Sequence, residues 1–359
     1  MLKIDFYESG VGETILLTFP HGGMGIVDAH PSPTACRPGI LDLVAGRPLH
    51  FVCLTHPHRD HGLDLIPVLE KNPHVEAFWH TVSDVDVTVF LQQEAMNYPN
   101  YPSACREAVE RMKKGWAEFL VDLYGAVVEN ECIHRHQLRS NLRPELVDGV
   151  NIHFLGPDES MAQRFVAAHN KRLQDFQTPL PSANLLSAIL ALQYGGVTVL
   201  LGADALKENW RSATRLFHKD GLPKVRILKV PHHGASNALQ IQRHGQEHNY
   251  LDICSREPRA KSVLFAGDAK HPDHGVYRRL KAQTDLLCLS NGLKGGGRSA
   301  NPLNINLPGA RAVTLPPVCN PVVSFTITNQ GVVTQTAGAC NNACEQYQSS
   351  SKGPWPSTP

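Results

Sequence analysis

The stretch "FVCLTHPHRDHGLDLIPVLE", residues 51–70, decides the fold. A short apolar run, typical of a buried strand, leads directly into "HPHRDH", which contains three histidines and one aspartate within six residues. One interpretation is a solvated polar turn. The other is a metal site, because imidazole and carboxylate groups are common zinc ligands and alternate residues of a tight loop can face different sides. The remaining sequence favours one of the two.

Further polar clusters follow apolar runs in the same way. They are Asp28 after "GIV", Asp204 after "VTVLLGA", His232 with His233 after "RILKVP", and His271 after "SVLFAGDAK". The ends of neighbouring strands meet at one edge of a sheet, where α/β proteins commonly place ligand sites. Five clusters of metal-binding residue types at predicted strand ends therefore favour the metal site.

The spacing also predicts how the ligands divide. His56 and His58 can hold one metal, while Asp60 and His61 reach a second and Asp204 bridges the two. Two ions about 3.5–4 Å apart can share a hydroxide and stabilise a developing oxyanion. We expect two Zn²⁺ ions per chain, and Mn²⁺ or Fe also suits this mixture of ligands.

Composition excludes several classes of protein. Apolar residues make up 42% and charged residues 19% of 359, which is typical of a globular chain with a sizeable core. The formal net charge of +1 argues against tight non-specific binding to duplex DNA. Neither a signal peptide nor an apolar run of about 18 residues is present, so we expect no membrane span and a cytoplasmic location.

Cysteine usage agrees with that location. Nine cysteines, an odd number scattered along the chain, indicate reduced thiols and no disulfide framework. The nearest grouping, Cys319 with Cys340 and Cys344, does not have the spacing of a standard zinc knuckle.

Local patterns predict one domain over residues 1–338, followed by a flexible tail over 339–359. A helical insertion is expected over about 80–150, with a helix that stops at Gly125 and a polar loop at "ECIHRHQLRSNLRPE". Gly195-Gly196 joins two apolar segments and predicts a hairpin. The other apolar runs predict the strands that lead to the polar clusters.

These motifs resemble a known family. "THPHRDHG" resembles the signature of the metallo-β-lactamase fold, and the more specific resemblance is to the hydrolase domain of the DNA-uptake protein ComEC. "ESGVGETILLTFPHGGMGIVDAH" resembles that group's opening, with its G-x-G-[DE] turn. "NLLSAILALQYGGVTVLLGADA", "LKVPHHGAS" and "GDAKHPDHG" resemble its later segments, in order, between about residues 3 and 290. The resemblance implies a four-layer αββα sandwich of two mixed β-sheets.

The resemblance also implies a set of site residues. The implied metal ligands are His56, His58, Asp60, His61, Asp204 and one of His232 and His233. His271 is implied as a ligand or a phosphate-binding group, and Asp28 as a structural residue beneath the site. Two departures stand out. Gly-Ala-Asp replaces the usual Gly-Asp, and Asn184 stands where many relatives have a third histidine ligand; His134, His136 and His169 are only distant candidates for it.

The implied function is metal-dependent hydrolysis, in which a metal-bound hydroxide attacks and Asp60, Asp204 and His271 act in catalysis. Ser236 and Asn184 are the expected substrate-binding residues, and Ser236 or His271 is expected to assist the leaving group. The resemblance favours a phosphodiester substrate, either nucleic acid or a nucleotide. Two alternatives stay open: a carbonyl hydrolase acting on a lactone, thioester or β-lactam, and a metal-stabilised interaction subunit. The fold alone does not choose among them, and protein partners are not predicted.

Overall fold

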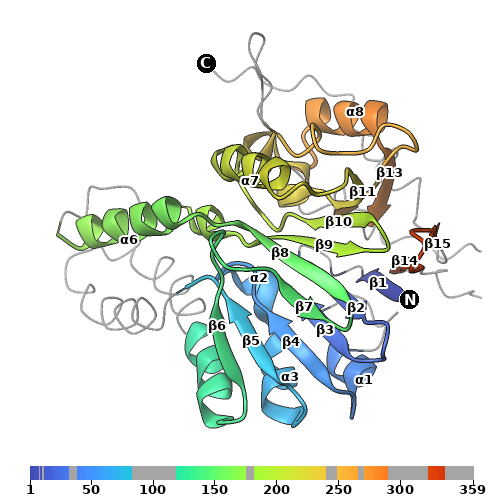
Figure 1. The fold of residues 1–359 in the computed structure, drawn as a ribbon. Coiled ribbons are helices and arrows are strands. Elements are labelled where there is room, and N and C mark those ends of the chain that lie inside the picture. Colours follow the sequence, from blue (N-terminus) through green and yellow to red (C-terminus); the bar gives the residue numbers. More distant parts are fainter. Residues whose placement is uncertain are drawn as a thin grey trace, which may run out of the picture.

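The computed structural model of the protein describes residues 1–7, 9, 12–31, 39–82, 119–174, 182–239, 249–265, 271–289 and 322–335. The strands in this part of the chain form two mixed sheets (Figure 1). In the first sheet the order is β15-β14-β1-β2-β3-β4-β5-β6, and in the second it is β13-β12-β11-β10-β9-β8-β7. Both sheets combine parallel and antiparallel pairs, so both are mixed.

The first sheet contains β1 (Leu2–Tyr7), β2 (Thr14–Thr18), β3 (Met24–Val27), β4 (Leu49–Cys53), β5 (Ala77–His80), β6 (His134–Gln137), β14 (Val322–Ile327) and β15 (Val333–Gln335). The second contains β7 (Glu145–Val147), β8 (Val150–Gly156), β9 (Ile189–Tyr194), β10 (Val197–Leu201), β11 (Val225–Lys229), β12 (Lys261–Phe265) and β13 (Asp285–Leu289). β3 to β6 run parallel to one another, as do β10 to β13. The carboxyl ends of these parallel strands are where the polar clusters of the sequence lie.

Helices cover the outer faces of the two sheets (Figure 1). On the first sheet these are α1 (Ile40–Val44), α3 (Leu65–Lys71) and the helical residues 119–129, and on the second they are α7 (Lys207–Lys219) and α8 (His274–Gln283). α2 (Arg59–Gly62) follows β4 and carries His61, and α6 (Glu159–Gln174) extends to one side (Figure 1). Three short 3₁₀ turns, η1 (Ala183–Leu186), η2 (Pro231–Gly234) and η3 (Ser236–Ala238), lie at strand ends or between elements. No helix in the described ranges is both long and apolar enough to traverse a bilayer.

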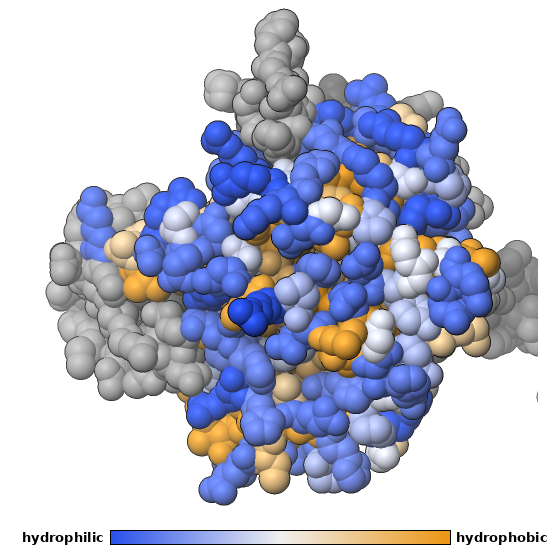
Figure 2. Space-filling model, in the orientation of Figure 1, coloured by the Kyte–Doolittle hydropathy of each residue, from blue (hydrophilic) through white to orange (hydrophobic). Residues whose placement is uncertain are grey.

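Three apolar cores hold these layers together. The central core lies between the sheets and contains Phe6, Phe51 and Leu190, each at most 1% exposed. A second core joins the first sheet to α1, α3 and residues 119–129, and a third joins the second sheet to α7 and α8. Burial of apolar surface on both faces of each sheet is the main stabilising term. The predicted αββα architecture is therefore confirmed. On the face in Figure 2 hydrophilic residues predominate, and the orange groups are small and separated.

Most strands expected from apolar runs are present. β9 and β10 pair antiparallel across Gly195 and Gly196, so the predicted hairpin is confirmed. A second antiparallel pair, β14 with β15, lies at the edge of the first sheet.

The stretch at 131–145 differs from its prediction. It was expected as a polar loop, but His134–Gln137 forms β6, an edge strand parallel to β5, and Glu145 begins β7. Pairing with an existing sheet edge outweighs the weak strand propensity of this polar sequence. The helix expected to stop at Gly125 continues to residue 129. The remainder of the expected insertion, residues 83–118, and the expected tail over 339–359 lie outside the described residues.

The cysteines only partly follow the prediction. Cys53, Cys132 and Cys254 are free, as expected, and burial raises the pKa of Cys254 to about 12. Cys288 is disulfide-bonded, so the expectation of reduced thiols is wrong at this position. Cys319, Cys340 and Cys344 lie outside the described residues.

Candidate metal centre

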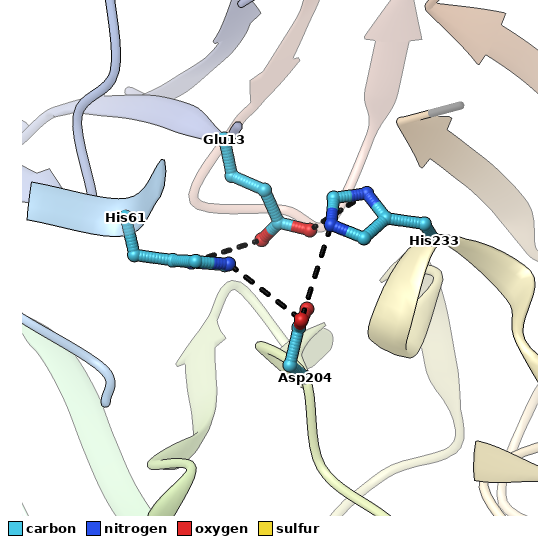
Figure 3. Close-up of side chains that lie close together, drawn as sticks. All are labelled: Glu13, His61, Asp204 and His233. Atoms are coloured by element: carbon cyan, nitrogen blue, oxygen red, sulfur yellow. Dashed lines mark ion pairs between the residues drawn. The ribbon is translucent and has the colours of Figure 1, made fainter. Parts of the chain in front are cut away.

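Four buried side chains converge between the two sheets. Figure 3 shows Glu13, His61, Asp204 and His233 pointing toward one another. Each offers one ligand atom, and these atoms all lie within 4.8 Å of one another. The side chains come from the turn before β2, from α2, from the turn after β10 and from η2. We call this group the four-donor centre.

Asp28 fixes the orientation of the histidine loop. Its Oδ2 accepts hydrogen bonds from His61 Nδ1 at 2.7 Å and from the Thr55 hydroxyl at 2.7 Å. Since the Thr55 proton goes to Asp28, its oxygen accepts from His56 Nδ1, 3.1 Å away. The Nδ1 protons of both histidines are therefore held, and their Nε2 lone pairs remain for another partner. A carboxylate behind a metal-binding histidine has this effect on its tautomer.

His233 is oriented in the same manner. Its Nδ1 donates to the carbonyl oxygen of Phe265 at 3.1 Å, and its Nε2 lies 3.9 Å from Asp204 Oδ2. The turn that presents it has left-handed backbone angles, with φ of 46° at His232 and 51° at His233. This conformation is unfavourable for residues with a Cβ atom and is often found at functional sites.

Gly12 brings Glu13 into the centre. A Cβ on Gly12 would lie 2.3 Å from the carbonyl oxygen of Asp60, so only glycine permits this approach to the histidine loop. The backbone N–H of Glu13 then donates to that same carbonyl at 3.3 Å. Gly12 and Glu13, the end of the G-x-G-[DE] motif, thus pack directly against the loop that carries His61.

Lys229 is the cation of the centre. Its side chain is fully buried and pairs with Glu13 Oε1, while its Nζ lies 3.8 Å from Asp204 Oδ1. The same ammonium donates to the Ala203 carbonyl at 2.6 Å. A lysine is almost never fully buried unless it is paired, and here two carboxylates supply the pairing.

The surroundings shift the pKa values of the two carboxylates in opposite directions. Burial raises the pKa of Glu13, although Lys229 opposes this. Burial also acts to raise the pKa of Asp204, but the nearby histidines and Lys229 outweigh it and hold the pKa well below its ordinary value. Asp204 therefore stays ionised at neutral pH and can act as an anionic ligand.

The pKa values of His61 and His56 also shift in opposite directions. Burial acts to lower the pKa of His61, but the surrounding aspartates outweigh it and hold that pKa well above its ordinary value. For His56, burial and the neighbouring His61 and His58 lower the pKa well below its ordinary value. His56 is thus neutral near pH 7, whereas His61 sits in a strongly negative site that attracts either a proton or a cation.

The residues present fit a divalent metal. Among the buried polar atoms of the described residues, His61 Nε2 and Glu13 Oε2 have no hydrogen-bond partner. Buried polar atoms are normally satisfied, so a group of unpartnered donor atoms is unusual. Two imidazole nitrogens and two carboxylates match the ligand preference of Zn²⁺.

His56 and His58 form a separate pair. His56 Nε2 lies 3.0 Å from His58 Nδ1, a separation close to that of two nitrogens on one metal ion. Asp60, expected as a ligand, is 36% exposed at its side chain, and its Oδ2 lies 3.9 Å from His61 Nε2. It therefore stands at the solvent-facing side of the four-donor centre.

The remaining predicted residues lie around the centre. His232 Nε2 is 3.9 Å from Asp204 Oδ2 and 3.2 Å from the Asn184 amide nitrogen. Its ring centroid lies 5.7 Å from that of His271. Ser236 is exposed. His134 and His136 are exposed on β6 and do not belong to the four-donor centre. The side chain of His169 lies outside the described part of the chain.

Sequence reasoning missed Glu13 and Lys229. Both lie in segments that carried the family resemblance, "GVGETILL" and "LKVPHHGAS". The available signals were an acidic residue directly after a glycine turn and a lysine directly after the apolar residues Ile227 and Leu228. Neither signal reveals that the two side chains meet in the folded chain.

No protein-family model matches the sequence, and the curated proteins contain no match to it. Several solved structures are similar in arrangement. Igni18, a novel metallo hydrolase from the hyperthermophilic archaeon Ignicoccus hospitalis KIN4/I, has a TM-score of 0.38 at 11% identity, over 80% of this chain and 95% of its own. A diphosphatase from the PhnP family has a TM-score of 0.38 at 10% identity, and the match covers 80% of this chain and 94% of its own. The hydrolase AbOPH of the beta lactamase superfamily has a TM-score of 0.33 at 12% identity, over 61% and 71%.

Proposed function

We propose that this protein is a metal-dependent hydrolase that cleaves phosphodiester bonds in nucleic acid or nucleotides. The observation that carries the proposal is the convergence of Glu13, His61, Asp204 and His233 within 4.8 Å, all buried. The Nδ1 atoms of both histidines are held by acceptors behind them, which leaves both Nε2 atoms facing Asp204. A site built in this way is pre-oriented for a cation.

The residues of the four-donor centre would hold the metal, with Asp60 at its open side. When bound, a divalent cation supplies Lewis-acid activation of water and stabilisation of negative charge. Asp28 positions His61, and through Thr55 it positions His56. Asp60 is the carboxylate of this region that solvent reaches, so it can hold or accept a proton next to a substrate.

The phosphodiester class is supported by the resemblance of "LKVPHHGAS" and "GDAKHPDHG" to the hydrolase domain of ComEC. The near-zero net charge favours a short single strand or a nucleotide over long duplex DNA. His271 and Asn184 flank His232 at the side of Asp204 and are the proposed contacts to the substrate.

The test combines metal content with a substrate panel. Wild type and Asp60→Ala would be loaded with Zn²⁺ or Mn²⁺ and assayed on bis-p-nitrophenyl phosphate, labelled single-stranded DNA, a lactone and nitrocefin. We expect phosphodiester cleavage that disappears in Asp60→Ala. The matched control is Asp122→Ala, the same change at an exposed aspartate in the 119–129 helix, and it should keep full activity.

Two results would contradict the proposal. Cleavage of lactones or nitrocefin without any phosphodiester cleavage would indicate a carbonyl hydrolase. Less than one equivalent of metal, with no substrate turned over, would favour the interaction subunit.

A further inference from the structure

The two oxygens of Asp204 have different surroundings. Oδ2 lies 3.7 Å from His61 Nε2 and 3.9 Å from His233 Nε2, so it faces the imidazoles. Oδ1 lies 3.8 Å from Lys229 Nζ and has no hydrogen-bond partner. An aspartate that bridges two metal ions with both oxygens needs an ion at each of them. Here an ammonium stands at the second oxygen.

The two oxygens of Glu13 also have different surroundings. Its Oε1 pairs with Lys229, while its Oε2 is buried without a hydrogen-bond partner, 3.9 Å from His61 Nδ1. One oxygen of each carboxylate therefore faces Lys229, and the other is left for a cation at the four-donor centre. Lys229 cannot withdraw easily, because its ammonium also donates to the Ala203 carbonyl at 2.6 Å and its side chain is fully buried.

The His56–His58 pair is a poorer site for a second ion. Within the described ranges, no carboxylate oxygen lies within 4.0 Å of a ring nitrogen of either histidine. Asn184, which stands where a third histidine was expected, directs its amide nitrogen to His232 Nε2 at 3.2 Å. Asp204 and Asp60 act on the His56–His58 pair from beyond 4.0 Å, whereas two carboxylates belong to the four-donor centre, so the pair should hold a divalent ion less strongly.

We propose that the chain binds one divalent cation tightly, through Glu13, His61, Asp204 and His233, and that the Lys229 ammonium occupies the position beside Asp204 that a second cation requires. This inference rests on the proposed metal-dependent function and replaces the expectation of two equivalent ions. The His56–His58 pair then takes a second ion only weakly.

The first test is the number of metal ions that bind. Full-length protein would be dialysed against Co²⁺ and Zn²⁺, bound metal would be counted, and the visible absorption of Co²⁺ would report the ligand geometry. We expect one tight equivalent in wild type and one in His56→Ala, with the same Co²⁺ spectrum. His233→Ala should lose this tightly bound equivalent. His136→Ala, the same change at an exposed histidine on β6, is the matched control and should match wild type.

The second test concerns Lys229 itself. Lys229→Arg keeps a cation beside Asp204 and should keep one tight equivalent, whereas Lys229→Met frees the Oδ1 side and should raise the count toward two. If circular dichroism shows that Lys229→Met is unfolded, the metal counts of His56→Ala and His233→Ala still decide whether the chain binds one cation tightly.

The outcomes separate the two proposals. Two tight equivalents in wild type, one of them lost in His56→Ala, would overturn the single-ion inference and leave the proposed hydrolase intact. A folded Lys229→Met variant that still binds one equivalent would overturn the role given to Lys229. No tight equivalent in wild type would overturn the metal-dependent function itself.

Discussion

His61 Nδ1 lies 2.7 Å from Oδ2 of Asp28, and Asp28 itself has a left-handed backbone with φ of 55°. Asparagine and aspartate tolerate this conformation better than other residues with a Cβ atom. The backbone N–H of Thr55 donates to the other oxygen of the same carboxylate at 2.8 Å. Asp28 therefore joins the strand end of β3 to the histidine loop and fixes the tautomer of His61.

Asp28→Asn should weaken metal binding by about 10–100-fold, because the amide has one acceptor oxygen and its NH2 group would face either the Thr55 backbone N–H or the His61 Nδ1–H. Asparagine keeps the left-handed backbone, so the fold should survive. The measurement is competition with a chromophoric chelator for Zn²⁺. The control is Asp148→Asn, the same change at another left-handed aspartate (φ 48°) on the turn between β7 and β8. Equal affinity in Asp28→Asn and wild type would contradict the role of Asp28.

His233→Ala and His232→Ala should differ in their response to metal. His233 Nε2 faces Asp204 while its Nδ1 is held by Phe265, whereas the Nε2 of His232 is engaged by Asn184. Adding Zn²⁺ should raise the melting temperature of wild type and His232→Ala, but not that of His233→Ala, because only a ligand that binds the folded state stabilises it. Differential scanning fluorimetry with and without a chelator measures this. The reverse pattern would make His232 the ligand.

Lys229→Met should lower the free energy of unfolding by about 3–5 kcal/mol, because it leaves the buried Glu13 carboxylate without its partner. Glu13→Gln added to it removes the unpaired charge, so the double variant should be more stable than Lys229→Met alone. Urea unfolding in the presence of chelator gives the free energy of unfolding of wild type, of each single variant and of the double variant, which together form a double-mutant cycle. Strictly additive effects would show that the two side chains do not interact.

We expect the contacts of His50, which is not part of the four-donor centre, to make the free energy of unfolding depend on pH. Burial acts to lower its pKa, but hydrogen bonds to Glu76 at 3.0 Å and Asp148 at 3.2 Å outweigh this and raise it. A raised folded-state pKa means that the stabilisation is fully present below the unfolded pKa of 6.5 and is lost as pH rises through the folded pKa. His50→Gln should therefore cost more stability at pH 5.5 than at pH 8.5.

Urea unfolding at both pH values measures this difference. His136→Gln, at an exposed histidine of β6, is the control and should cost the same at both. A loss in His50→Gln that does not change with pH would mean that the His50 contacts do not depend on protonation.

Much of the fold followed from local patterns. Mostly apolar runs such as "TILLT", "LHFVC" and "VRILK" form strands because most of their side chains are buried on the two faces of a sheet that helices cover. Polar strands could not be found in this way. "HRHQ" is exposed along its length and becomes β6 only because the edge of β5 offers hydrogen-bond partners.

By itself, the sequence determined where the reactive groups stand along the chain, because a polar residue directly after a buried strand has to lie at the edge of a sheet. The predicted ligands His61, Asp204 and His233 all follow such strands. Only the tertiary structure decided which atoms face one another. The left-handed turn at His232 and His233 selects one histidine for the four-donor centre, and the approach of Gly12 to Asp60 brings in Glu13. Lys229 meets Glu13 for the same reason: contacts between the two sheets depend on packing across the central core, which no local pattern encodes.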